Sequence, residues 1–346
     1  MTTGRSKWLA ALVSGALFFA LGCSSSSDDD KANQDTTEET LPKHCAGVRI
    51  VYFPGGSDTD SFARIVYNGA RAAETDLGPT MTYKWSNWSN ATMVTQFGEA
   101  VATAPDGIAM MGHPGDSALQ TLVDQAATAG IIVTSQNTPL ALLEAKYKDK
   151  GFGYVGQELY ASGKLLGEGA IKRFSTLAGG EAIVWGFPDS LPRGSRTKGV
   201  ADALLAGGMT AVHRYDIGTA MDANPAQSGA AFAAAITAHP TVKLIVTDHG
   251  GMTSAAKTLL EAAGKTESDI VLIGFDLSSN TAEAIGLGWV DLVLDQQPFL
   301  QGYLPVLQIC LTKLYGFAGL HIDTGSGLVH KDNVASLLTL IEQGVR

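Results

Sequence analysis

Residues 48–85 read VRIVYFPGGSDTDSFARIVYNGARAAETDLGPTMTYKW and contain one strand, one helix and a second strand. The run at 48–53 is apolar and rich in β-branched and aromatic side chains, which is typical of a buried parallel strand. Apolar side chains from Phe62 to Leu77 then recur at helical spacing, and a Gly-Pro pair stops the helix. Together with the run at 81–85, this stretch predicts a β-α-β unit.

The same alternation of short apolar runs and helical stretches continues along the chain. Further strands are predicted at 107–111, 131–135, 152–155, 182–185, 242–247, 270–275 and 290–294. Further helices are predicted at 117–129, 160–174, 196–206, 226–238, 252–263 and 299–315. Pro305 should kink or split the last helix. So many strands exceed one common open sheet, which predicts an α/β fold of two doubly wound parallel-sheet lobes.

The N-terminal segment has the composition of an export signal followed by a tether. Two basic residues precede an apolar run at 8–21, which is short for a membrane span and typical of a signal-peptide core. The block FALGC at 19–23 resembles a bacterial lipobox, which predicts a signal peptide over 1–22 and lipidation of Cys23. The alternative is an ordinary cleaved signal with an incidental cysteine. Residues 23–45 are mostly polar and predict a disordered tether on an exported, lipid-anchored protein.

Composition and charge exclude several classes of protein. The 346 residues are 45% hydrophobic, which is too apolar for a disordered chain. With 34 acidic against 24 basic side chains, the sequence offers no basic patch for nucleic acid. Three cysteines are too few for a disulfide scaffold or a cysteine-rich zinc module.

The sequence also lacks the common catalytic motifs. Residues 151–156 match G-x-G-x-x-G, but they form a predicted strand instead of following one, so they do not predict a dinucleotide site. Gly264-Lys265-Thr266 looks like the end of a phosphate loop, but Leu259 stands where its first glycine is required. No H-E-x-x-H, C-x-x-C or G-x-S-x-G motif occurs. We therefore expect a protein without enzyme activity, cofactor or metal.

Polar and aromatic side chains cluster just after the predicted strands, where ligands bind in parallel sheets. Carboxylates, amides and a guanidinium suit a polyhydroxylated ligand, because each hydroxyl both donates and accepts a hydrogen bond. Aromatic faces suit the C–H face of a pyranose. The candidate ligand-binding residues are Asp60, Phe62, His113, Asn137, Gln157, Arg196, His249, Asp276 and Gln296.

Several short motifs, in this order, resemble the type I periplasmic sugar-binding proteins of the ribose/galactose-binding family. They are DSF at 60–62, YNGA at 67–70, PDGI at 105–108, YVGQE at 154–158, GFD at 274–276 and DQQP at 295–298. The resemblance runs from about 48 to 345 and implies a periplasmic binding protein-like I fold with a multi-strand hinge. It implies lobe I at 46–156 and 297–325, and lobe II at 157–296 and 326–346.

The resemblance also implies roles for individual side chains. Phe62 would stack on the sugar, Asn137 and Asp276 would hold hydroxyls from opposite lobes, and Arg196 would bridge hydroxyls or the ring oxygen. Gln157 and Gln296 would contact the ligand beside the hinge. His113 and His249 stand where ribose-binding relatives carry asparagines, so the sugar itself is open. Ala63 stands where many relatives place a second aromatic residue, so Trp85, Trp88 or Trp185 is expected to supply that face.

Simpler interpretations of these residues stay open at this point. Asp276 could cap a helix, Arg196 could lie on a surface, and Phe62 could belong to the core. The histidines could be ordinary loop residues, and two histidines alone are weak evidence for metal. Cys45 and Cys310 should lie at the same pole of one lobe, as a disulfide or as two buried thiols.

These observations favour a monomeric, lipid-anchored solute receptor in the periplasm or at the cell surface. It would bind a monosaccharide or related polyol by hinge closure and deliver it to a membrane ABC permease. One alternative is a receptor that presents a sugar or signal molecule to a membrane sensor kinase. Another is an enzyme with His113 and His249 as acid and base. A transcriptional repressor of the same fold is excluded, because the predicted secretion tether stands where such a repressor carries its DNA-binding domain.

Overall fold

The computed structural model describes residues 43–346. The predicted signal peptide, Cys23 and most of the predicted tether lie outside these residues. Cys45, which we expected at the end of the tether, is instead fully buried and forms a disulfide with Cys310. Its backbone N–H donates to the carbonyl of Leu77 at 2.7 Å, so folded structure begins slightly before the predicted boundary.

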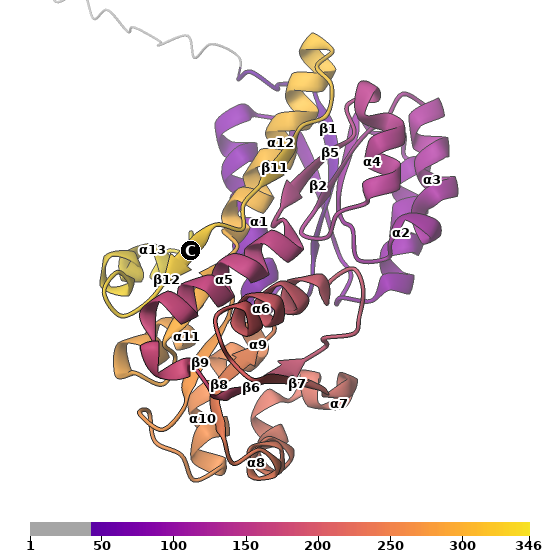
Figure 1. The fold of residues 1–346 in the computed structure, drawn as a ribbon. Helices are drawn as coiled ribbons and strands as arrows, with labels where there is room; N and C mark the ends of the chain where they lie inside the picture. Colours follow the sequence, from indigo (N-terminus) through magenta and orange to yellow (C-terminus); the bar gives the residue numbers. More distant parts are fainter. Residues whose placement is uncertain (1–42) are drawn as a thin grey trace, which may run out of the picture. The chain divides into compact units, whose positions relative to one another are not determined.

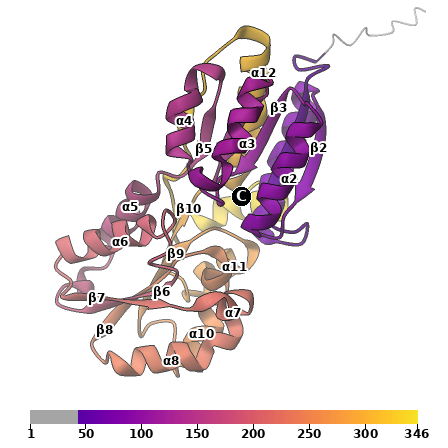
Figure 2. The same cartoon turned by 90° about the vertical axis from the view of Figure 1, so that its right-hand side faces the viewer.

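The first sheet has six parallel strands in the order β11-β5-β4-β3-β1-β2. Helices α1 and α12 cover one face, and α2, α3 and α4 cover the other (Figures 1 and 2). We call this sheet with its helices the first lobe. Its strands are β1 (Arg49–Gly55), β2 (Thr80–Trp85), β3 (Gly107–Met111), β4 (Ile132–Gln136), β5 (Gly153–Gly156) and β11 (His321–Asp323). Its helices are α1 (Ser61–Leu77), α2 (Asn90–Ala102), α3 (Asp116–Thr128), α4 (Ala141–Tyr147) and α12 (Pro298–Tyr315).

The second sheet has the order β12-β10-β9-β8-β6-β7, with β12 antiparallel to β10 and the other neighbours parallel. We call this sheet with its helices the second lobe. Its strands are β6 (Glu181–Gly186), β7 (Ala211–Asp216), β8 (Val242–Thr247), β9 (Val271–Phe275), β10 (Leu292–Asp295) and β12 (Gly327–Val329). Its helices are α5 (Leu159–Arg173), α6 (Ser195–Ala206), α7 (Gly218–Ala223), α8 (Gly229–Ala238), α9 (Gly250–Ser254), α10 (Ala256–Ala262), α11 (Ser279–Leu287) and α13 (Leu338–Glu342).

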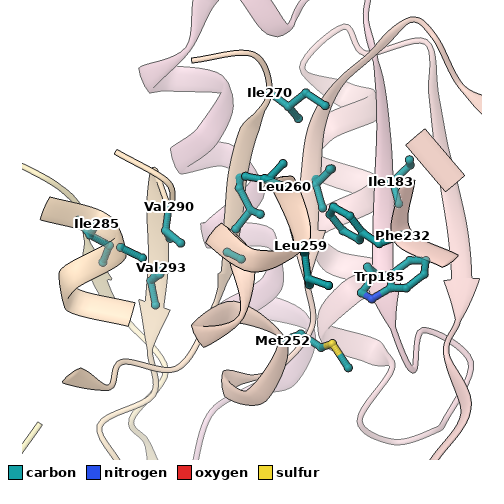
Figure 3. Close-up of a cluster of buried hydrophobic side chains, with 14 of the residues drawn as sticks. Ile183, Trp185, Phe232, Met252, Leu259, Leu260, Ile270, Ile285, Val290 and Val293 are labelled. Carbon is teal, nitrogen blue, oxygen red and sulfur yellow. The ribbon is translucent and has the colours of Figure 1, made fainter. Parts of the chain in front are cut away.

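Helices cover both faces of each sheet. Successive side chains along a strand point to opposite faces, so they pack into two different cores. In β1, Ile50 and Tyr52 pack towards α1 and α12, whereas Val51 and Phe53 pack towards α2 and α3. The second sheet repeats the arrangement. Figure 3 shows the larger of its two cores, where Trp185 of β6 lies among side chains from α8, α9 and α10.

The chain passes between the two lobes three times, after β5, after β10 and after β11. Hydrogen bonds join these crossings to one another. Thr324 N–H donates to the Gly156 carbonyl at 2.9 Å, and the Gln297 side chain donates to the Thr324 carbonyl at 2.8 Å. In each sheet one strand lies between two neighbours whose connections run in opposite directions: β1 between β2 and β3, and β6 between β7 and β8. Ligands of doubly wound sheets bind outside such switch points.

Of the kink or split expected at Pro305, the split does not occur: α12 runs unbroken from Pro298 to Tyr315. Proline cannot donate to the carbonyl four residues earlier, which belongs to Gln301. The buried hydroxyl of Tyr52 donates to that carbonyl instead, at 2.8 Å. In contrast, the single helix expected at 252–263 is two helices, α9 and α10, that meet at Ala255.

No helix within residues 43–346 combines the length and the apolar character needed to cross a membrane.

Candidate functional site

An aromatic group lies at the carboxyl ends of β1 and β3. The Trp88 ring lies 6.1 Å from that of Phe62 and 5.2 Å from that of His113, centroid to centroid. Its indole N–H donates to Oδ2 of Asp60 at 3.0 Å, and Oδ1 of Asp60 caps α1 by accepting from the backbone of Ala63. Asp60 therefore caps α1 and also holds the Trp88 ring in place. We call Asp60, Phe62, Trp88 and His113 the first wall.

The backbone at the end of β1 is adapted to this ring. Gly55 has a φ of +102°, and a Cβ at this position would lie 2.4 Å from the Trp88 ring. Only glycine leaves that space. Of the three tryptophans that could supply a second aromatic face, Trp88 is the one beside Phe62. Trp185 is 2% exposed within the second lobe's core, and the Trp85 ring packs on Tyr67.

His113 is neutral over the ordinary pH range. Burial, together with the positive charges of Arg193 and Arg196, lowers its pKa to about 3. These two arginines belong to the second lobe, so the first wall faces them. Nδ1 of His113 is buried and has no hydrogen-bond partner among residues 43–346. A ligand contact through His113 is therefore expected to be insensitive to pH between about 5 and 7, because the ring stays unprotonated throughout.

Arg196 is buried at the start of α6, although the sequence left open a surface position. It is 3% exposed, and its Nε and one terminal nitrogen have no partner within the described chain. The guanidinium carbon lies 4.7 Å from the centre of the Phe275 ring. Burial lowers the pKa of Arg196 to about 10, which still leaves it charged. A buried cation with unused donors is a costly arrangement unless something else binds them.

Asp248 lies beside these arginines and was missed from the sequence, where the neighbouring His249 attracted attention instead. It is 1% exposed, accepts from the Phe187 N–H at 2.7 Å and pairs with Nδ1 of His249. Burial alone would raise its pKa, but the hydrogen bond to His249 and the arginine charges outweigh burial and hold the pKa well below its usual range. A Cβ on Gly186 would lie 2.0 Å from this carboxyl group, so glycine is required there.

Arg193, Arg196, Asp248 and His249 form what we call the second wall. Phe187, at the end of β6, adds an aromatic face: its ring stacks on His249 with centroids 6.1 Å apart and planes 23° from parallel. These residues follow β6 and β8, the two strands at the second sheet's switch point.

A row of side-chain amides connects the two lobes beside the walls. Asn137 donates to Oε1 of Gln296 at 3.0 Å and to Oε1 of Gln301 at 3.2 Å. Gln296 in turn donates to Oδ1 of Asp276. Asp276 does not cap the helix that follows it, because Ser278 caps α11; its Oδ2 accepts from Gly250 N–H at the start of α9. Most of the polar atoms of this row are therefore already paired.

Two residues of this row have strained backbones. Asn137 and Asp276 have φ values of +65° and +73°, as does Trp88 of the first wall at +57°. Non-glycine residues rarely adopt this region, and such strain concentrates at functional sites. Gln157 lies at the first crossing, buried, with its Oε1 unpaired among the described residues. The nine predicted residues thus lie in the two walls, in the amide row or, for Gln157, at the first crossing. Trp88 is the one of the three candidate tryptophans that lies beside Phe62, and Arg193 and Asp248 are additions that the sequence did not single out.

A surface pocket of about 280 Å³ lies elsewhere, between β2 and α2. Of its charged side chains, Lys84 and Glu99 pair with each other at 3.5 Å, and Arg49 pairs with Asp106 at 3.7 Å. It contains none of the unpaired buried groups that mark the walls.

Comparisons with known proteins agree with this architecture. The sequence profile described as "Periplasmic binding protein domain" matches residues 50–310. The xylose/arabinose-binding protein of Sulfolobus acidocaldarius is 29% identical over 272 residues, which are 74% of this chain and 65% of that protein. The D-ribose/D-allose-binding protein of Pseudomonas aeruginosa is 27% identical over 170 residues, 49% of this chain and 51% of that protein. The chain therefore spans just under two thirds and about half of the length of these relatives.

Solved structures share the fold. A carbohydrate transporter from Acidothermus cellulolyticus in complex with myo-inositol has a TM-score of 0.70 and 24% identity, covering 86% of this chain and 99% of that one. An ABC transporter solute-binding protein from Burkholderia graminis in complex with D-arabinose has a TM-score of 0.73 and 20% identity, covering 84% and 98%. With the two-lobed α/β architecture and the profile match over most of the described residues, the chain belongs to the periplasmic binding protein domain family.

Proposed function

We propose that this protein is the extracytoplasmic solute-binding protein of an ABC importer and that it binds a monosaccharide between its two lobes without transforming it. The observation that carries the proposal is Arg196, a buried guanidinium with two unpaired nitrogens that faces the first wall. A buried donor without a partner costs about 1–3 kcal/mol, or more when it is charged. Two sugar oxygens would satisfy these donors, and the guanidinium geometry suits neighbouring hydroxyls.

The first wall supplies apolar ring surface opposite the charged groups of the second wall. The rings of Phe62 and Trp88 offer apolar surface for the C–H face of a pyranose, and Asp60 holds the Trp88 ring in place. Since the two walls belong to different lobes, a sugar that touches both binds better when the lobes are together. Ligand binding would then shift the population towards the closed form.

The proposal also covers the protein's cellular location and its membrane partner. The lipobox-like block at 19–23 supports export and lipid anchoring through Cys23, and the closed monomer would deliver its sugar to a membrane permease. The relatives and solved structures are described as sugar-binding or transport proteins, which favours import over presentation to a sensor kinase.

The test is a thermal melt of a chain that starts at Lys43, the first residue that the structure describes, against pentoses, hexoses, polyols and nucleosides. Amino acids serve as the control ligands. A ligand that binds the folded state alone at 100 times its Kd should add about 2.7 kcal/mol to the free energy of unfolding, which raises Tm visibly. A shift with one sugar and none with amino acids supports the proposal. A shift with amino acids or nucleosides alone would contradict it.

An experiment in cells distinguishes the importer role from the sensor role. If the protein serves an importer, deletion of its gene should abolish uptake of that labelled sugar at low concentration. Unchanged uptake together with a lost transcriptional response would favour the sensor.

A further inference from the structure

Three metal-ligating side chains meet at the opposite end of the second sheet from the second wall. Glu181 is the first residue of β6, His213 lies in the edge strand β7, and His239 ends α8 just before β8. The second wall follows the carboxyl end of β8. At about 3.3 Å per residue, the six residues of β8 separate the two places by roughly 20 Å.

The local register explains why these side chains share one face. Glu181 pairs with Ala211 and Ile183 pairs with His213, so Glu181 and His213 lie on the same side of the sheet as Ile183. That side is covered by α8, whose C-cap residue is His239. Three segments far apart in sequence therefore present one imidazole or carboxylate each to the same spot.

The ligand atoms converge on a single carboxylate oxygen. Nε2 of His213 lies 3.1 Å and Nδ1 of His239 lies 4.0 Å from Oε2 of Glu181. One ligand atom from each residue lies within 4.8 Å of the others, and the two imidazole rings stack with centroids 3.5 Å apart. Ligands on a tetrahedral ion at about 2.0–2.1 Å are about 3.4 Å apart, so small side-chain rotations would complete the geometry.

A second layer of residues holds these ligands in orientation. The hydroxyl of Tyr215 lies 3.0 Å from Nε2 of His239, which leaves Nδ1 directed towards Glu181. The hydrogen bond from His213, with a further one from Thr241, lowers the pKa of Glu181, so the carboxylate is ionised. Histidines that bind metal usually have their other ring nitrogen held by such a partner.

We propose that Glu181, His213 and His239 bind one divalent transition-metal ion, with Zn²⁺ as the ion that fits best. Two imidazoles and one carboxylate form a nitrogen-rich set that suits Zn²⁺ over Ca²⁺ or Mg²⁺, which prefer oxygen ligands. All three side chains are half-buried, with 21–28% of each exposed, so an ion can reach them from solution and a water molecule can take a fourth position. The ion would join the edge strand β7 to β6 and to the turn before β8.

The experiment is calorimetric titration of Zn²⁺ into the full chain at pH 7.5, with any affinity tag removed and metal stripped beforehand. We expect one Zn²⁺ per chain, a higher Tm on binding, and no response to Ca²⁺ or Mg²⁺. His213→Ala and Glu181→Gln should each weaken binding by about 100-fold, and Tyr215→Phe by about 10-fold, since it removes only an outer partner. His44→Ala, at an exposed histidine of the first lobe, should bind Zn²⁺ as the unaltered chain does.

The near-isosteric Glu181→Gln variant keeps the test decisive if His213→Ala unfolds, and its Tm without metal establishes folding. Absence of Zn²⁺ binding by the unaltered chain would overturn the proposal. Undiminished binding by folded Glu181→Gln and His239→Ala variants would overturn it as well, because the ion would then lie elsewhere. Sugar-induced Tm shifts should be the same with and without Zn²⁺. The metal-site proposal can therefore fail while the proposed sugar binding holds, and the reverse.

Discussion

The two lobes share a topology but present opposite chemistry at their switch points. The first wall presents mainly aromatic surface: Phe62 and Trp88 form it, His113 carries no charge, and the Asp60 carboxylate is bonded to Trp88 and to the start of α1. The second wall is ionic, with two arginines beside the carboxylate of Asp248. Neither surface alone matches a sugar, which has an apolar face and a polar rim. If the protein binds a sugar as proposed, this difference predicts that binding favours closure, because the sugar has both its apolar and its polar contacts only when both walls touch it.

The ionic wall should carry the larger share of affinity, and Arg196→Met tests this most strongly. Methionine keeps the apolar contact with Phe275 but removes the buried charge. We expect sugar affinity to fall by about 3–4 kcal/mol, a loss of several hundredfold, measured by calorimetry.

Lys198→Met is the matched control for Arg196→Met. It lies on the same helix, but its ammonium pairs with Asp202 at the surface. Affinity and Tm should both stay close to those of the unaltered chain. If Lys198→Met lost as much affinity as Arg196→Met, the effect would come from α6 as a whole and the contrast between the walls would fail.

The lobes also differ in covalent closure, since the disulfide between Cys45 and Cys310 lies in the first lobe. It closes a loop with a sequence separation of 265 residues. Replacing both cysteines by serine should lower the free energy of unfolding by about 2–3 kcal/mol, measured by denaturant titration. Sugar affinity should not change, because the bond lies at the pole of the first lobe. Equal stability of the oxidised and substituted chains would show that the bond adds nothing to the first lobe.

The aromatic wall should contribute less than the ionic one. Trp88→Ala removes the ring that packs against Phe62 and His113, and we expect a loss of about 1–2 kcal/mol in sugar affinity. Trp88→Phe should recover about half of that loss, since it keeps a ring but loses the bond to Asp60. Trp289→Phe, in the second lobe beside Lys257, is the control and should leave affinity unchanged. A larger loss from Trp88→Ala than from Arg196→Met would reverse the ranking of the walls.

The sequence predicted the buried strands of both sheets well, because a strand covered on both faces is a continuous apolar run. It missed β7, an edge strand that is only partly buried, because its sequence AVHRYD includes three polar side chains and forms no continuous apolar run. It missed β11 and β12 because three residues carry no periodicity. The helix α2 was also missed, although Ser89 caps it, because its apolar stripe is weak.

The site residues also differ in how well the sequence predicted them. Residues directly after a recognisable strand, such as Asp276 and Asn137, could be named because the strand end gives their position. Trp88 and Arg193 lie in turns, so their place depends on tertiary contacts: Trp88 is held by Asp60 and the space above Gly55. Asp248 was passed over because sequence alone does not show that a carboxylate is buried next to two arginines. The metal-binding triad gave no signal at all, since its three residues come from separate elements.

The smallest expected effect concerns the contact between α4 of the first lobe and α5 of the second. The two ring nitrogens of His321 in β11 bond to the carboxylates of Glu144 in α4 and Glu158 at the start of α5, and the ring packs on Tyr154. Burial opposes protonation, but the hydrogen bonds to both carboxylates outweigh it and raise the pKa of His321. The stabilisation is therefore complete below the unfolded-state pKa of about 6.5 and is lost as the pH rises through the higher folded-state value.

We expect Tm to fall slightly on going from pH 6 to pH 8.5, and His321→Gln to remove this slope, measured by melts across that range. His330→Gln, near the C-terminus of the second lobe, is the control and should keep the slope. Because 34% of the His321 side chain is exposed, solvent weakens the pairs and the change should be the smallest of those expected here. If the slope survived in His321→Gln, the pH dependence would come from another group, and the link between α4 and α5 would not depend on a charged histidine.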